Sequence, residues 1–197
     1  MRYSLLLPTI PLLTALAAAP AAIRGAEGSA AALRPYEHSF FQCSIPAGWS
    51  ASPAQGQAEK EKKIYGIDLV GPAGKKGLTP SISVKYYAKG NDLFRTPKDY
   101  INIHSRPIKG LALKGDRYDK VSRIKVAGRA ASVFDRKKTD FTGGMLDDSA
   151  VEVYERFIVV PAKGGFYALS YYSSFQEAKE HLPLFEAVLA SFKPLAK

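Results

Sequence analysis

The sequence predicts an α+β protein built on a mostly antiparallel sheet of about six or seven strands, with helices packed on its faces. Segments with the two-residue alternation of strands follow one another, separated by turn residues rather than by helices. Segments with helical spacing occur near the middle of the chain and at its C-terminus. There is no βαβ alternation of the kind that builds parallel sheets, so hairpins are expected to connect most strands.

Residues 22–36 are rich in Ala and Gly and predict a flexible lead-in to a single folded domain over residues 37–197. Three strands are expected first, over residues 38–45, 64–70 and 81–87. In the first of them Phe41, Cys43 and Ile45 share one face, which is typical of a half-buried strand. Small and polar residues predict loops between these strands, over residues 50–58 and 71–77.

The next pattern is a helix start at Thr96-Pro97-Lys98-Asp99, which combines a capping hydroxyl, a proline at the first helical position and an acid three residues on. The helix is expected to end near Arg106, before Pro107. Two hairpins follow, over residues 121–127 with 130–137 and residues 151–160 with 166–172, turning at Gly128 and at Lys163-Gly164-Gly165. A longer loop is expected between these hairpins, over residues 139–149.

The C-terminal segment predicts an amphipathic helix. Ser174 and Glu177 have the spacing of a capping box. Apolar residues then recur at helical spacing, at Phe175, Ala178, Leu182, Phe185, Val188, Leu189 and Phe192. Pro183 is expected to break or kink this helix, because proline lacks the N–H that an interior position needs.

The N-terminus has the pattern of a secretory signal peptide. Arg2 gives a short positive start, and no charge occurs from residue 3 to residue 23. Ala19-Pro20-Ala21 places small residues at the two positions that a signal peptidase reads, which predicts a signal peptide over residues 1–21, with a cut possible as late as residue 30. The alternative is an uncleaved N-terminal membrane anchor, because about 20 apolar residues can span a bilayer. Either way, an extracytoplasmic location is expected.

Lysine and arginine outnumber aspartate and glutamate by 28 to 18, which gives a formal net charge of +10. A charge of this size favours acidic partners. Since export removes the protein from most nucleic acid, an acidic protein or an anionic membrane surface is the expected partner. Cys43 is the single cysteine, so an intramolecular disulfide is excluded and no disulfide-linked partner is required.

Several short motifs together resemble one known family. They are Phe41-x-x-x-Ile45-Pro46-x-Gly48-Trp49, Gly128 before a strand, the hairpin of residues 155–160 and 165–169, and a closing Ser191-Phe192-Lys193. In order and spacing, residues 38–193 resemble the PsbP-like superfamily, named for an extrinsic subunit of the photosynthetic oxygen-evolving complex. The resemblance implies an α/β/α sandwich and a non-enzymatic accessory or binding role. None of the calcium- or manganese-associated residues of the plant subunit can be matched to a position of this chain.

Candidate catalytic residues are few. Cys43 and His38 lie five residues apart, and on one strand an odd separation places them on opposite faces, about 16 Å apart. The chain has neither a Gly-x-Ser-x-Gly nor a His-Glu-x-x-His motif. A catalytic Cys43 therefore requires that His104 or His181 approach it through the fold, and a buried, inert thiol is the plainer interpretation.

Two further patterns have both a functional and a structural interpretation. Asp140, Asp147 and Asp148, with neighbouring glycines, form either a calcium-holding loop or a solvated hairpin loop. The second pattern consists of Trp49 and three tyrosines of the last hairpin, Tyr167, Tyr171 and Tyr172. These aromatic residues either line a ligand cleft or fill the core. No cofactor is predicted, since no cofactor motif is present.

Basic segments are the strongest remaining signal. The candidate partner-binding residues are Arg136, Lys137 and Lys138, at the end of one strand, and Arg123 and Lys125, on one face of another. The first hypothesis is an exported, non-enzymatic binding or accessory protein that docks an acidic or membrane-associated partner through these residues. The second is a small extracytoplasmic hydrolase or ligand-binding enzyme, which requires that two or more of Cys43, His104, His181 and the loop aspartates converge.

Overall fold

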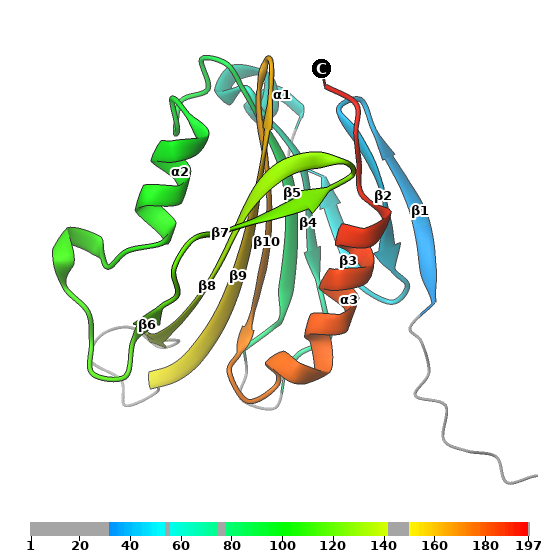
Figure 1. Ribbon diagram of the computed structural model, residues 1–197. Coiled ribbons are helices and arrows are strands. Elements are labelled where there is room, and N and C mark those ends of the chain that lie inside the picture. Colours follow the sequence, from blue (N-terminus) through cyan, green and yellow to red (C-terminus); the bar gives the residue numbers. More distant parts are fainter. Residues whose placement is uncertain (1–31, 54–55, 75–77, 142–149, 197) are drawn as a thin grey trace, which may run out of the picture. The chain divides into compact units, whose positions relative to one another are not determined.

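The larger of two antiparallel sheets forms the centre of the fold (Figure 1). The computed structural model describes residues 32–53, 56–74, 78–141 and 150–196. These residues belong to one compact unit, residues 31–197. Among them, eight strands form the larger sheet, in the order β3, β4, β5, β10, β9, β8 and β6, with β7 paired to β8. Their bounds are β3 Ser50–Pro53, β4 Ile64–Val70, β5 Ser81–Ala88, β6 Arg117–Tyr118, β7 Ser122–Val126, β8 Arg129–Phe141, β9 Ala150–Ala162 and β10 Gly165–Ser174. Every pairing is antiparallel, which confirms the predicted fold class.

A second sheet of three strands, which the sequence did not predict, consists of β1 Leu33–His38, β2 Phe41–Pro46 and β11 Lys193–Pro194. The helices are α1 Gly56–Lys62, α2 Pro97–His104 and α3 Ala178–Ser191, with a 3₁₀ turn at Ile108–Gly110. Figure 1 shows α2 on one side of the larger sheet and α3 on the other. No helix of the described residues is long and apolar enough to cross a membrane.

The side of the sheet that carries α3 holds the larger core. Alternate residues of the central strands, such as Leu169 and Tyr171, pack there beneath Phe185 of α3. The predicted face of the first strand joins this core, because Phe41, Cys43 and Ile45 are buried in β2. Tyr167, fully buried, is also tied by hydrogen bonds: its hydroxyl donates to the carbonyl of Phe40 and accepts from the N–H of Ala196, both at 2.7 Å.

The opposite side of the sheet carries α2 over a cluster of aromatic residues. The predicted capping box is confirmed, since the N–H of Asp99 donates to Thr96 Oγ1 at 3.2 Å and the N–H of Thr96 donates to Asp99 Oδ2 at 3.0 Å. Tyr100 is buried against the sheet, where the rings of Tyr87 and Phe166 stack at 4.8 Å. The helix ends at His104, two residues before the predicted end.

Two glycines allow neighbouring strands to approach β5 closely. A Cβ at Gly66 of β4 would lie 2.1 Å from the carbonyl oxygen of Val84, and one at Gly165 of β10 would lie 2.0 Å from that of Tyr87. Their φ angles of 155° and 149° are also ones that side chains rarely allow. Any larger residue would push β4 or β10 away from the centre of the sheet.

Some boundaries differ from the sequence expectation. Residues 33–36, predicted as part of the lead-in, form most of β1, and the expected strand at residues 38–45 begins instead at Phe41, after a turn. The segment 50–58, predicted as a loop, contains β3 and the start of α1. Residues 139–141 extend β8 instead of entering a loop. The predicted signal peptide, with residues 22–31 of the lead-in, lies outside the described residues.

The C-terminal helix also differs. Ser174 and Glu177 do interact, through Ser174 Oγ and Glu177 Oε2 at 2.7 Å, but α3 begins only at Ala178, so the pair precedes the helix. Pro183 lies inside a continuous helix rather than breaking it. It removes only the bond that an N–H at this position would donate to the carbonyl of Lys179, which is an exposed residue. Phe175 is 44% exposed and lies outside the buried stripe.

Candidate functional site: basic residues beside helix α2

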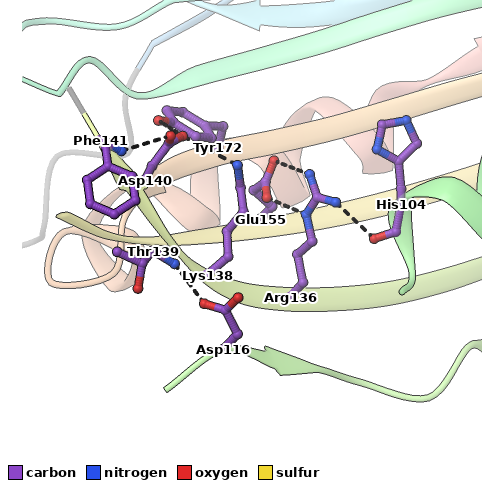
Figure 2. Close-up of polar contacts among 9 residues, drawn as sticks. All are labelled: His104, Asp116, Arg136, Lys138, Thr139, Asp140, Phe141, Glu155 and Tyr172. Atoms are coloured by element: carbon purple, nitrogen blue, oxygen red, sulfur yellow. Dashed lines mark hydrogen bonds and ion pairs between the residues drawn. The ribbon is translucent and has the colours of Figure 1, made fainter. Parts of the chain in front are cut away.

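The five predicted partner-binding residues lie on two strands. Arg136, Lys137 and Lys138 are consecutive in β8, so their side chains alternate between the two faces of the sheet. Arg136 and Lys138 point to the face that carries α2, as Figure 2 shows for the network they form with neighbouring carboxylates. Arg123 and Lys125 lie on β7, which pairs with a different stretch of β8, residues 129–133. The structure therefore separates the two groups.

Arg136 is held in a nearly buried ion pair. Its guanidinium binds both carboxylate oxygens of Glu155, with Nη2 to Oε1 at 3.0 Å. The side chains are only 12% and 11% exposed. Nη1 also donates to the carbonyl of His104 at 3.1 Å, which fixes the C-terminal end of α2 to the sheet (Figure 2). An arginine used in this way has little surface left for a partner.

The two lysines beside it are paired as well. Lys137 Nζ lies 2.6 Å from Glu152 Oε1 and 4.5 Å from the centre of the Phe175 ring. Lys138 Nζ lies 3.4 Å from Asp140 Oδ2, and that carboxylate oxygen also accepts a hydrogen bond from the hydroxyl of Tyr172 at 3.2 Å. These neighbouring acids neutralise the basic run that the sequence singled out.

Arg123 and Lys125 are exposed and lie on one face of β7. Their pairing with Ser132 and Ala130 places them on the side of the sheet that carries α2. The segment that connects α2 to β7 adds further exposed cations that the sequence reasoning did not single out. Together we call these residues the basic surface, which comprises Arg106, Lys109, Lys114, Lys120, Arg123 and Lys125. Among the described residues, none of the six has a carboxylate within ion-pair distance.

A signal for the missed cations was present in the sequence. From Tyr100 to Gly115 there is no acidic residue, while Arg106, Lys109 and Lys114 all fall in this stretch. Sequence reasoning gave more weight to the run at residues 136–138 because three adjacent cations form a denser motif. The paired strand β9 supplies the acids that neutralise two of these cations, and its register cannot be read from composition.

The residues of the enzymatic hypothesis occupy separate elements. Cys43 is 5% exposed in β2, and burial raises the pKa of its thiol to about 12, so the thiol stays protonated. His38 ends β1 and stacks on Phe41 at 4.9 Å, so the expectation that His38 and Cys43 share one strand was wrong. His181 lies on α3, 6.1 Å from the ring of Trp49. His104 lies on α2, across the larger sheet.

His104 packs among aromatic rings, 4.3 Å from Tyr100 and 5.0 Å from Phe157. Burial, and then the positive charges of Arg136 and Lys138, lower the pKa of His104 to about 4. The imidazole is therefore neutral at neutral pH. Its packing among aromatic rings, and the hydrogen bond that its carbonyl accepts from Arg136, indicate a structural role at the C-terminal end of α2.

The calcium-loop interpretation is only partly within the described residues. Asp140 lies in β8 and binds Lys138 and Tyr172, while Asp147 and Asp148 lie outside the part of the chain that the structure describes. Among the described residues, no three His, Cys, Asp or Glu side chains are placed to hold a metal ion.

The proposed aromatic cleft is part of the core. Trp49, Tyr167 and Tyr171 are at most 6% exposed and pack in the larger core, and Tyr172 is half-buried on the other face. A hollow of about 480 Å³ does occur elsewhere, beside the start of α3, lined by Tyr154, Phe175, Gln176, Ala178, Lys179 and Leu182.

Comparison with known proteins finds no matching family model and no curated protein of similar sequence. Solved structures do match. Cyanobacterial PsbP (CyanoP) from Synechocystis sp. PCC 6803 has a TM-score of 0.50 and 15% identity, over 86% of this chain and 96% of that one. PA94 from Pseudomonas aeruginosa, a protein of unknown function, has a TM-score of 0.46 and 14% identity, over 84% and 99%. LpqN from Mycobacterium tuberculosis, involved in cell envelope biogenesis, has a TM-score of 0.47 and 16% identity, over 82% and 90%.

Proposed function

We propose that this chain, which has the PsbP-like fold that its sequence motifs predicted, is an exported, non-enzymatic binding or accessory protein. It docks an acidic or membrane-associated partner through the basic surface. The observation that carries this proposal is the contrast between two sets of cations. Those of residues 136–138 are neutralised by neighbouring acids, whereas the six of the basic surface are exposed without such acids among the described residues.

Unpaired surface cations have two effects that suit a docking role. They raise the local concentration of an acidic partner and so speed its association. They also make binding sensitive to salt, because charges on an exposed surface are screened over about 8 Å at physiological ionic strength. The fold itself leaves the function open. The support therefore comes from the surface charge and from the export signal that the sequence predicts.

The proposal predicts that charge reversal on β7 abolishes partner binding. The mature protein and an Arg123→Glu/Lys125→Glu variant are immobilised and exposed to an extracytoplasmic extract at low and high salt, and bound components are identified by mass spectrometry. A Lys60→Glu/Lys62→Glu variant changes the net charge equally at exposed positions of α1 and serves as the control.

We expect a component that binds the mature protein and the α1 control at low salt, elutes at high salt, and does not bind the β7 variant. Equal binding by all three proteins, or binding that salt does not weaken, would contradict a role for the basic surface.

A further inference from the structure

The loop between α2 and β6 exposes leucine side chains. Leu111 is 79% exposed and Leu113 is 51% exposed. A single exposed leucine is ordinary on a protein surface. Here the two lie within the six-residue segment Lys109–Lys114, which we call the leucine loop, and a lysine stands at each end of it. Two exposed leucines this close in the sequence are a candidate interaction surface.

The leucine loop is anchored on both sides rather than hanging free. On its N-terminal side, Arg136 donates to the carbonyl of His104, as described above. On its C-terminal side, Asp116 accepts the N–H of Leu113 at 3.0 Å through Oδ2 and the N–H of Thr139 at 2.9 Å through Oδ1. Figure 2 shows the bond to Thr139, which ties Asp116 to β8. The leucines are thus presented to solvent by a fixed frame, so docking orders little additional backbone.

The charged residues near Leu111 and Leu113 in the sequence indicate which kind of partner these leucines contact. Arg106, Lys109 and Lys114 are exposed, and no acid occurs between Tyr100 and Asp116. A bilayer with anionic lipids offers a flat negative surface above an apolar interior. Leucines can enter that interior to a shallow depth, while the long stems of lysine keep their ammonium groups at the level of the lipid phosphates.

We propose that the leucine loop inserts Leu111 and Leu113 into the outer part of an anionic bilayer, while Lys109 and Lys114 bind the lipid headgroups. This inference rests on the proposed docking function and narrows its partner to a lipid surface. Arg123 and Lys125, on the side of the sheet that carries α2, add electrostatic attraction without insertion.

The test measures co-sedimentation of the mature protein with vesicles of phosphatidylcholine alone and of phosphatidylcholine with phosphatidylglycerol. A Leu111→Ser/Leu113→Ser variant removes the apolar contact without touching the core. A Leu33→Ser/Leu195→Ser variant makes the same chemical change at leucines that are 43% and 48% exposed, in β1 and beyond β11. Thermal unfolding checks that both variants are folded.

We expect the mature protein and the Leu33/Leu195 control to bind the anionic vesicles and not the neutral ones. The leucine-loop variant should bind them about tenfold more weakly or worse, as expected for two lost leucine contacts. Equal binding by the leucine-loop variant would overturn insertion but leave electrostatic docking intact. No binding of the mature protein to anionic vesicles would overturn the lipid partner, and the extract experiment would then decide separately whether an acidic protein is bound.

Discussion

Arg136 and Glu155 carry opposite charges in a place that solvent barely reaches. Removing two ions from water costs several kcal/mol each, and the cost is offset only by close geometry and further hydrogen bonds. Both conditions hold here, since the guanidinium binds both carboxylate oxygens and also the carbonyl of His104. The pair therefore joins three elements, β8, β9 and α2, rather than serving as a surface charge.

Removing one partner should be far more harmful than removing both. We predict that Arg136→Met lowers the free energy of unfolding by about 3–5 kcal/mol, because it leaves the Glu155 carboxylate buried without a counter-charge. Arg136→Met/Glu155→Leu should recover most of that loss. Urea denaturation measures both values. Lys138→Met is the control, since its pair with Asp140 is more exposed and is expected to contribute less than about 1 kcal/mol. Equal losses for Arg136→Met and Lys138→Met would contradict the structural role of Arg136.

Helix α3 covers the larger core through a few side chains. Phe185 and Val188 are fully buried, and the Phe185 ring lies 5.9 Å from that of Tyr171 in β10. The helix itself contains a proline and has no side-chain cap, so its own hydrogen bonds hold it weakly. Its position must therefore come mainly from packing against β2 and β10.

We predict that Phe185→Ala lowers the free energy of unfolding by about 3–5 kcal/mol, because it leaves a cavity that the surrounding rings cannot fill. Phe175→Ala is the matched control. It removes the same ring from a residue that is 44% exposed, and should cost less than about 1 kcal/mol. Chemical denaturation followed by circular dichroism distinguishes the two. Similar losses at both positions would mean that α3 is not held by its buried face.

Elements with a strong apolar alternation could be predicted from the sequence, and elements without it could not. The expected strand at residues 64–70 coincides with β4, and that at residues 81–87 with β5 to within one residue. By contrast, β1 contains Pro35 and is largely exposed, and β3 has the sequence Ser-Ala-Ser-Pro. Such edge strands are held by backbone bonds to a single neighbouring strand, β2 for β1 and β4 for β3, and their own residues show no apolar alternation to detect.

The candidate site could be predicted only in part, because the pairing between strands is not visible in the local sequence. The basic character of Arg136, Lys137 and Lys138 could be read from the sequence. Whether each charge is free depends on the register of β8 against β9, which places Glu155 directly opposite Arg136. Exposure alone, visible only in the folded chain, identifies the leucine loop as surface rather than core.

At the scale of the whole molecule, the folded unit and the predicted export signal divide the chain at nearly the same place. The compact unit spans residues 31–197, and β1 begins at Leu33. A cut between residues 21 and 30 therefore removes no described strand. It also takes away few charges, because Arg2, Arg24 and Glu27 are the charged residues of the N-terminal 30. The mature protein would then keep both the sheet and the basic surface on which docking depends.

We predict that protein purified from the extracytoplasmic fraction of producing cells begins between residues 22 and 31, as measured by intact mass and N-terminal sequencing. Ala21→Arg should shift the cut toward residue 30 or leave the precursor uncut, because the peptidase requires small residues at the two positions it reads. Ala32→Arg, beyond both candidate cuts, is the control and should leave the mature N-terminus unchanged. Recovery of the full-length chain from the cytosol would contradict export. Recovery of the intact chain in the membrane would favour the anchor, and in that case the leucine loop would meet the bilayer from a tethered protein.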